Sequence, residues 1–69
     1  MKNLKAEMAR RELTGEQLAI LIKMPLSTFY RKFQGATEFT ITEAFAISKV
    51  LGHQVDYLFA KGELDENTL

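Results

Sequence analysis

Hydrogen-bonding side chains gather in residues 26–34, a segment whose aromatic residues have helical spacing. Phe29 and Phe33 are four residues apart and would share one face of a helix. The opposite face would carry a guanidinium, two hydroxyls and an amide, those of Ser27, Thr28, Arg31 and Gln34. Such groups can exchange hydrogen bonds with the exposed edges of nucleic-acid bases. The segment therefore predicts an apolar side that packs and a polar side that binds.

Catalysis and metal binding are not indicated by these residues. The hydroxyls of Ser27 and Thr28 have no neighbouring base in a nucleophile motif, and no pair of groups is spaced for acid–base work. The chain has no cysteine and one histidine, His53, which we expect at the surface of a loop. We therefore expect no catalytic residue, no metal site and no cofactor.

Length and composition indicate one small domain. A chain of 69 residues has room for a single core and buries only about 60% of its unfolded surface. No stretch approaches the roughly 20 apolar residues of a membrane span, and the lack of cysteine suits a reducing compartment. We expect a soluble, cytoplasmic protein that does not enter membranes.

The charges are balanced in total but not along the chain. The formal net charge is zero, which by itself argues against binding to phosphate. Residues 1–35 contain seven Lys or Arg and three Glu, whereas residues 36–69 contain two Lys and six Asp or Glu. The half that contains the polar segment is therefore the basic one, as expected if one surface meets phosphate. Chance segregation of solvated charges is the alternative.

Two capping boxes predict where two helices begin. Thr14 and Gln17 have the spacing of a capping box. In a capping box the hydroxyl of the first residue accepts a hydrogen bond from the backbone N–H three residues later, and the side chain of that later residue accepts one from the backbone N–H of the first. Thr40 and Glu43 repeat this spacing. The second box would begin a helix that runs through Leu51, and the glycine that follows would end it.

Other end signals predict two further helices. Asn3 would cap a first helix that runs to about Glu12. A third helix would begin at Pro25, which is tolerated in a first turn, and end at Gly35. Ser27 is an alternative cap that would shorten this helix by two residues.

The apolar residues recur with helical spacing and predict one core. The predicted inward-facing or core-filling residues are Leu4, Met8, Leu18, Ala19, Ile22, Met24, Phe29, Phe33, Ile41, Ala44, Phe45, Ile47, Ser48, Leu51, Val55, Leu58 and Phe59. Residues 55–60 would form a short last helix, and residues 61–69 an acidic, frayed tail. With no alternating strand pattern, we expect an all-α, compact five-helix domain over residues 1–60.

The order and spacing of three stretches resemble the helix-turn-helix family of phage repressors and Cro proteins, the lambda-repressor-like DNA-binding domains. The stretches are LTGEQLA at 13–19, STFYRKFQG at 27–35 and the segment 39–59. The resemblance covers nearly the whole chain and implies that the second and third helices form the helix-turn-helix.

In that family the third helix lies in the major groove while the second crosses the backbone. The positions that would then face bases are Leu26, Ser27, Thr28 and Arg31. Arg31 would suit the O6 and N7 atoms of guanine, and Leu26 the methyl group of thymine. The positions that would contact phosphate are Gly15, Glu16, Gln17, Lys23, Tyr30 and Lys32.

Several residues depart from the family's pattern. Gly15 stands where relatives often have Gln, and Lys23 where the turn usually has Gly, so Lys23 would need a left-handed or adjusted backbone. The loop at 36–38 is not basic. Met8 and Phe33 replace an Arg–Glu pair of some relatives. These departures favour weak binding, or binding only as a dimer.

The resemblance implies a sequence-specific transcriptional regulator that binds double-stranded DNA and occupies an operator. One domain contacts a half-site, so we expect a homodimer on a pseudo-palindrome with centres about 34 Å apart. The expected dimer surface consists of Val55, Tyr57 and Phe59, with Leu64 beyond them.

A second hypothesis uses the same fold for a protein partner, as in an antirepressor or an antitoxin-like module. Ile20 and Leu21 stand where most relatives have polar residues, so an apolar contact patch is expected there. The alternative for Leu21 is packing under the last helix, near Tyr57 or Phe59. The zero net charge also favours this hypothesis.

Overall fold

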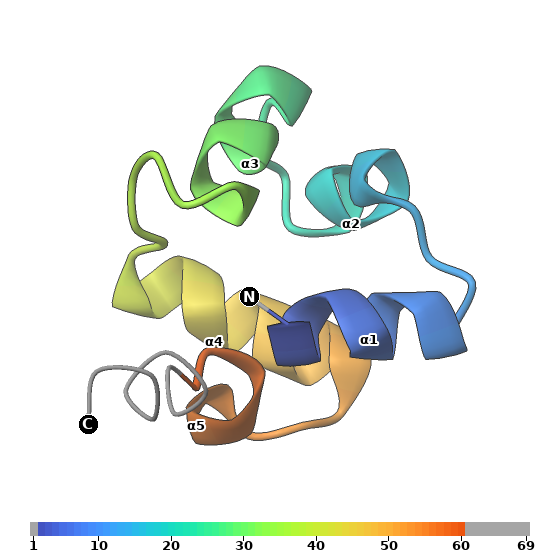
Figure 1. Ribbon diagram of the computed structural model, residues 1–69. Coiled ribbons are helices and arrows are strands. Elements are labelled where there is room, and N and C mark those ends of the chain that lie inside the picture. The colour runs from blue at the N-terminus through green and yellow to red at the C-terminus, as the bar shows by residue number, and fades with distance from the viewer. Residues whose placement is uncertain (1, 61–69) are drawn as a thin grey trace.

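The computed structural model describes residues 2–60, and these residues fold into five helices without a strand. The helices are α1 (Lys2–Arg10), α2 (Gly15–Leu21), α3 (Leu26–Phe33), α4 (Ile41–Leu51) and α5 (Val55–Leu58). Helices α2 and α3 pack together at the top of Figure 1, and α1, α4 and α5 lie below them. None of these helices has the length and apolar character needed to cross a membrane. The expected all-helical class is confirmed for this part of the chain.

Both capping boxes form as predicted. The Thr14 hydroxyl accepts a hydrogen bond from the backbone N–H of Gln17 at 3.1 Å, and the Gln17 side chain accepts one from the N–H of Thr14 at 2.9 Å. Thr40 and Glu43 make the same pair of bonds at the start of α4. Each box satisfies two N–H groups that a helix start leaves without partners, so these two starts are set locally.

Helix α3 is shorter than predicted at both ends. Pro25 is its N-cap and Leu26 its first residue, so neither a start at Pro25 nor a cap at Ser27 is correct. The helix ends at Phe33, two residues before Gly35, which has a left-handed φ of 92°. Gly52 ends α4 as expected, with a φ of 73°.

The limits of α1 also differ from the prediction. Asn3 is not a cap: it lies inside the helix, and its side-chain amide donates a hydrogen bond to the carbonyl of Tyr57 at 2.8 Å. The helix ends at Arg10 rather than near Glu12, whose φ of 52° is left-handed. The Arg11 guanidinium donates to the Leu51 carbonyl and so connects the end of α1 with the end of α4.

All four long helices and α5 contribute side chains to one core. Its buried members are Leu4, Met8, Leu18, Ala19, Met24, Phe29, Ile47, Leu51 and Leu58. Leu13, Ile22, Phe33, Phe39, Val50 and Phe59 are partly buried and pack against it. The helical periodicity therefore predicted most of the core correctly, because the buried members other than Met24 lie on the inner side of a helix.

Two large apolar residues of α4 are not where the sequence placed them. Ile41 and Phe45 were predicted in the inner stripe of α4 but are 75% and 56% exposed. The inner side of α4 is centred instead on Ala44, Ile47 and Leu51, which leaves the first two on the outer side. Leu21 is 55% exposed, as expected for an apolar patch with Ile20, so the alternative in which it packs under the last helix is wrong.

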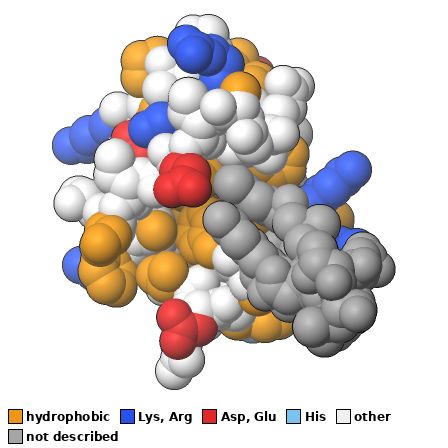
Figure 2. All heavy atoms as spheres, turned by 60° about the vertical axis from the view of Figure 1, so that its left-hand side comes forward, with side chains coloured by type: hydrophobic (Ala, Val, Ile, Leu, Met, Phe, Trp, Pro, Cys, Tyr) orange, Lys and Arg blue, Asp and Glu red, His pale blue; other side chains and the backbone are white. Residues whose placement is uncertain are grey.

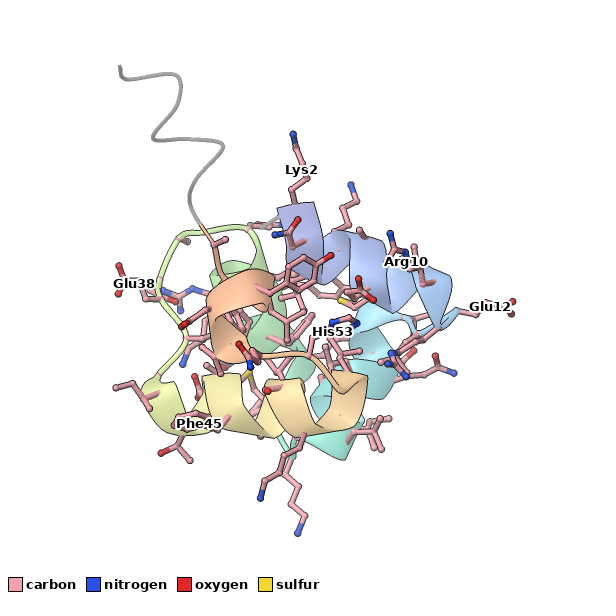
Figure 3. All side chains as sticks on the ribbon, turned by 90° about the horizontal axis from the view of Figure 1, so that it is seen from below. Lys2, Arg10, Glu12, Glu38, Phe45 and His53 are labelled. Atoms are coloured by element: carbon pink, nitrogen blue, oxygen red, sulfur yellow. The ribbon has the colours of Figure 1, made fainter. Side chains whose placement is uncertain are left out.

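A buried carboxylate joins α1 to the C-terminal part of the domain. Glu7 is 2% exposed, and one of its oxygens, Oε2, accepts hydrogen bonds from Arg10 and from the Tyr57 hydroxyl, both at 2.9 Å. The other oxygen, Oε1, lies 2.9 Å from Nε2 of His53. His53 was expected to be a plain surface residue; it is half-buried and bound to Glu7, near the centre of Figure 3.

These partners decide the ionisation of Glu7. Burial by itself raises the pKa of the carboxyl, but the Tyr57 hydrogen bond and the charges of Arg10 and His53 outweigh it, so the pKa lies below its ordinary value of 4.5. The same hydrogen bond raises the pKa of the Tyr57 hydroxyl. Glu7 is therefore an anion at neutral pH, and its partners offset the cost of burying that charge.

We predict that Glu7→Gln destabilises the protein at neutral pH and has a smaller effect in acid. A carboxyl with a lowered folded-state pKa stabilises the fold above its unfolded pKa, and this contribution disappears as the pH falls through the folded value. Denaturant unfolding at neutral pH and at about pH 3 would measure both effects. Glu16→Gln on α2, where the carboxylate is exposed, is the matched control and should change little at either pH. If Glu7→Gln lowered the free energy of unfolding equally at both pH values, the lowered pKa of Glu7 would be contradicted.

Candidate nucleic-acid interface

The connection between α2 and α3 is short, and each of its backbone N–H groups donates a hydrogen bond. Residues 22–25 separate the two helices, and Lys23 adopts a left-handed φ of 60°. The N–H of Lys23 donates to Ile20 at 3.1 Å, and the N–H of Met24 donates to Ala19 at 2.9 Å. The Met24 side chain is buried in the core. This connection holds α3 in one orientation against α2.

One face of α3 is held by aromatic packing. Phe29 has no exposed surface, and its ring stacks on Phe33 at a centroid distance of 5.5 Å. Phe39, from the loop after α3, lies 5.9 Å from the Phe29 ring. This confirms the prediction that the two phenylalanines of α3 belong to the packed side.

The other side of α3 presents most of the predicted base-facing residues to solvent. Leu26 is 39% exposed, Ser27 and Arg31 are exposed, and Thr28 is half-buried. Arg31 has no ion pair within residues 2–60, so no carboxylate of this part of the chain engages its guanidinium. The structure brings these four residues together at the first two turns of one helix. Their hydrogen-bonding groups could reach a shared ligand.

Tyr30 and Gly15 form a contact that the sequence did not reveal. Gly15 is buried, and a Cβ atom there would lie 2.6 Å from the Tyr30 hydroxyl and 2.8 Å from the ring. Only glycine therefore allows Tyr30 to lie against the first residue of α2 in this way. A glycine at the first position of a helix, where no turn requires one, was the signal available in the sequence.

The remaining predicted phosphate-contacting residues have different surroundings. Glu16, Gln17 and Lys23 are exposed, although the Gln17 side chain belongs to the capping box. Lys32 differs from them because its Nζ lies 2.7 Å from Oε1 of Glu43, and its side chain is 15% exposed. This bond from Lys32, together with one from the Thr40 backbone, lowers the pKa of Glu43. Lys32 thus connects α3 to α4, and a phosphate contact from it would require breaking that pair.

The described residues expected at a dimer surface also make contacts within the domain. Val55 is half-buried, Tyr57 is 38% exposed although its hydroxyl is bonded to Glu7, and the Phe59 ring packs on Phe39 at 5.5 Å. Leu64 and the predicted tail, residues 61–69, lie outside the described residues.

No protein-family model, curated protein or solved structure matches this chain. Residues 2–60 also contain no group of His, Cys, Asp and Glu that could hold a metal ion.

We predict that Lys23→Gly stabilises the protein. The left-handed backbone at Lys23 costs a residue with a Cβ atom about 1 kcal/mol, and glycine avoids this cost although it loses more entropy on folding. The free energy of unfolding should rise by roughly 0.5 kcal/mol, measured by denaturant titration. In the control Lys49→Gly, within α4, it should fall by about 1 kcal/mol. Destabilisation by both variants would show that the turn does not strain Lys23.

Proposed function

We propose that this protein is a sequence-specific DNA-binding transcriptional regulator with a helix-turn-helix of the lambda-repressor-like type. The observation that carries the proposal is the pair α2 and α3, joined by four residues, with α3 packed by Phe29 and exposing Ser27 and Arg31 on its other side. This is the arrangement in which a recognition helix enters a major groove. The resemblance of residues 13–19, 27–35 and 39–59 to that family supports it.

In this proposal α3 reads the bases with its first two turns. Arg31 donates two hydrogen bonds to a guanine edge, Ser27 and Thr28 form less selective hydrogen bonds, and Leu26 contacts a thymine methyl. Because Thr28 is half-buried, it contributes less than its neighbours. Arg31 is the group whose loss should change sequence preference most.

The backbone of the DNA would be held at the start of α2 and in the turn. Tyr30 lies against Gly15 there, and Lys23 is an exposed cation. Arg10, Arg11 and Lys32 belong to the basic half of the sequence but bind Glu7, the Leu51 carbonyl and Glu43 respectively. These internal bonds reduce the charge available for phosphate. A single domain should therefore bind weakly, and a second copy on an adjacent half-site would supply the missing affinity.

We predict that Arg31→Ala relaxes sequence selectivity. The wild-type protein would first select duplexes from a random-sequence library, and gel shifts would then compare both proteins on the selected duplex and on single-base variants. Arg31→Ala should lose about 1 to 3 kcal/mol of binding free energy on the selected duplex. The loss should be much smaller on duplexes in which the base that Arg31 contacts has been changed.

Lys5→Ala, an exposed cation on α1, is the matched control for this charge loss. It should leave the ranking of the duplexes unchanged. Failure of the wild-type protein to select any sequence, or to show binding that weakens with salt, would rule out the proposed function.

The exposed pair Ile20 and Leu21 favours a second candidate function, in which this fold serves mainly to bind a protein. The two side chains are 69% and 55% exposed and adjoin at the end of α2. Exposed neighbouring apolar residues in a small domain are typical of an interaction site. An antirepressor or antitoxin-like module would use such a patch.

We predict that Ile20→Glu with Leu21→Glu separates the two candidates. Both side chains are exposed, so the double variant should keep its fold, checked by circular dichroism and thermal unfolding. If DNA binding is the main function, gel-shift affinity on the selected duplex should change less than threefold. Loss of a co-purifying protein from the double variant but not from Arg31→Ala would instead support the protein-binding candidate.

A further inference from the structure

The ion pair between Lys32 and Glu43 joins α3 to the start of α4. Nζ of Lys32 lies 2.7 Å from Oε1 of Glu43, and the two side chains are 15% and 27% exposed. The pair spans the loop between the two helices, which descends on the left of Figure 1. Figure 2 brings this side forward and shows acidic side chains close to basic ones in the upper part of the molecule. The cation of Lys32 is therefore held on the helix that is proposed to meet DNA.

Lys32 occupies the flank of α3 next to the exposed polar side. It lies one turn after Thr28 and directly after the exposed Arg31. Within residues 2–60 its ion pair is the one with Glu43. A lysine carries its ammonium on a flexible stem of four carbons, so this charge can move away from its partner. A phosphate that approaches α3 would compete with Glu43 for the same ammonium.

The Lys32–Glu43 pair can be opened at a lower cost than the other ion pair made by a basic residue of the N-terminal half. Arg10 neutralises Glu7, which is 2% exposed, so its removal would leave an anion in the interior with one partner fewer. Glu43 is more exposed, and its Oε1 also accepts a hydrogen bond from the backbone N–H of Thr40 at 2.9 Å. It therefore keeps a partner and contact with water when Lys32 leaves.

We propose that Glu43 withholds the Lys32 ammonium from DNA, so that the wild-type protein binds every duplex with one phosphate contact fewer than its sequence allows. This inference rests on the proposed function. Glu43 belongs to the same domain as Lys32 and so competes with phosphate at a high effective concentration. Salt also screens a partly buried pair less than it screens a contact with phosphate. Because phosphate contacts carry no sequence information, the loss is the same on all duplexes.

The charge of Glu43 is present under ordinary conditions. Hydrogen bonds from Lys32 and from the Thr40 backbone hold the pKa of the Glu43 carboxyl below its ordinary value of 4.5. Glu43 is therefore an anion at neutral pH, and the competition for Lys32 operates there without any further signal.

Glu43→Gln removes the charge that holds Lys32 but preserves the start of α4. Glutamine also serves at the third position of a capping box, as Gln17 does in α2. The variant should keep its fold, as checked by circular dichroism and thermal unfolding. It should bind the selected duplex more tightly than the wild-type protein in gel shifts. This gain should grow about 3.5-fold when the salt concentration is lowered from about 200 mM to about 50 mM, as one added phosphate contact requires.

The double variant Lys32→Ala with Glu43→Gln identifies the source of this gain. It lacks both charges of the pair and therefore has the same net charge as the wild-type protein. It should bind the selected duplex like the wild-type protein, because the wild-type complex makes no use of Lys32. Tighter binding by the double variant would mean that Glu43 acts through its own charge. Weaker binding would mean that Lys32 already contacts DNA, and either result would overturn the proposal.

Asp56→Asn is the matched control for the change in net charge. Asp56 is an exposed carboxylate on α5, at the bottom of Figure 1, whereas α3 lies at the top. Its neutralisation should strengthen DNA binding much less than Glu43→Gln does. If the two variants gained equally, only the net charge would matter, and the proposed competition for Lys32 would be overturned.

Heparin, a polyanion without a base sequence, distinguishes failure of this proposal from failure of the proposed function. Glu43→Gln should elute from a heparin column at higher salt than the wild-type protein, and the double variant should elute with the wild-type protein. If these results are obtained but the wild-type protein selects no duplex, the competition for Lys32 stands and the DNA-binding function falls. If the wild-type protein selects a duplex that Glu43→Gln does not bind more tightly, the competition is overturned while DNA binding stands.

Discussion

The packing of α1 against α5, in the lower part of the domain in Figure 1, depends on the buried carboxylate of Glu7. It lies on the first helix, and its partners Tyr57 and His53 come from the far end of the described chain. Helix α5 has only four residues and cannot be stable alone. The hydroxyl of Tyr57 on Glu7 and the buried side chain of Leu58 fix it against α1. An anion without these partners would be strongly destabilising in the interior, so the arrangement is cooperative.

The upper part of the domain in Figure 1, formed by α2 and α3, is held together by packing between these helices rather than by charge. Phe29 fills the space between α3 and the core, Met24 anchors the connection, and Gly15 lets Tyr30 approach α2. The Lys32–Glu43 pair then joins this unit to α4. The polar side of α3 is thus supported by contacts on its other side, and its orientation is a consequence of those contacts. A rigid support of this kind is what recognition by a short helix requires.

The two surfaces left over by this packing differ in chemistry. The outer side of α3 has hydroxyls and a guanidinium, whereas the outer side of α4 has Ile41 and Phe45. The internal bonds of Arg10 and Lys32 reduce the basic character suggested by the charge distribution along the chain. In the proposed function, so little free positive charge on this surface makes the affinity for DNA depend on a second copy.

Local signals in the sequence determined the helical class, the starts of α2 and α4, and most of the core. Thr14 and Thr40 act on backbone groups three residues away, so their effect needs no tertiary contact. The tertiary structure alone decided that Phe45 stays in solvent, that Gly15 meets Tyr30, and that Glu7 meets Tyr57 across fifty positions of the chain. Helical periodicity specifies which residues share a face, but the number of neighbouring helices decides how wide a part of that face is covered. Contacts between distant residues leave no such period in the sequence.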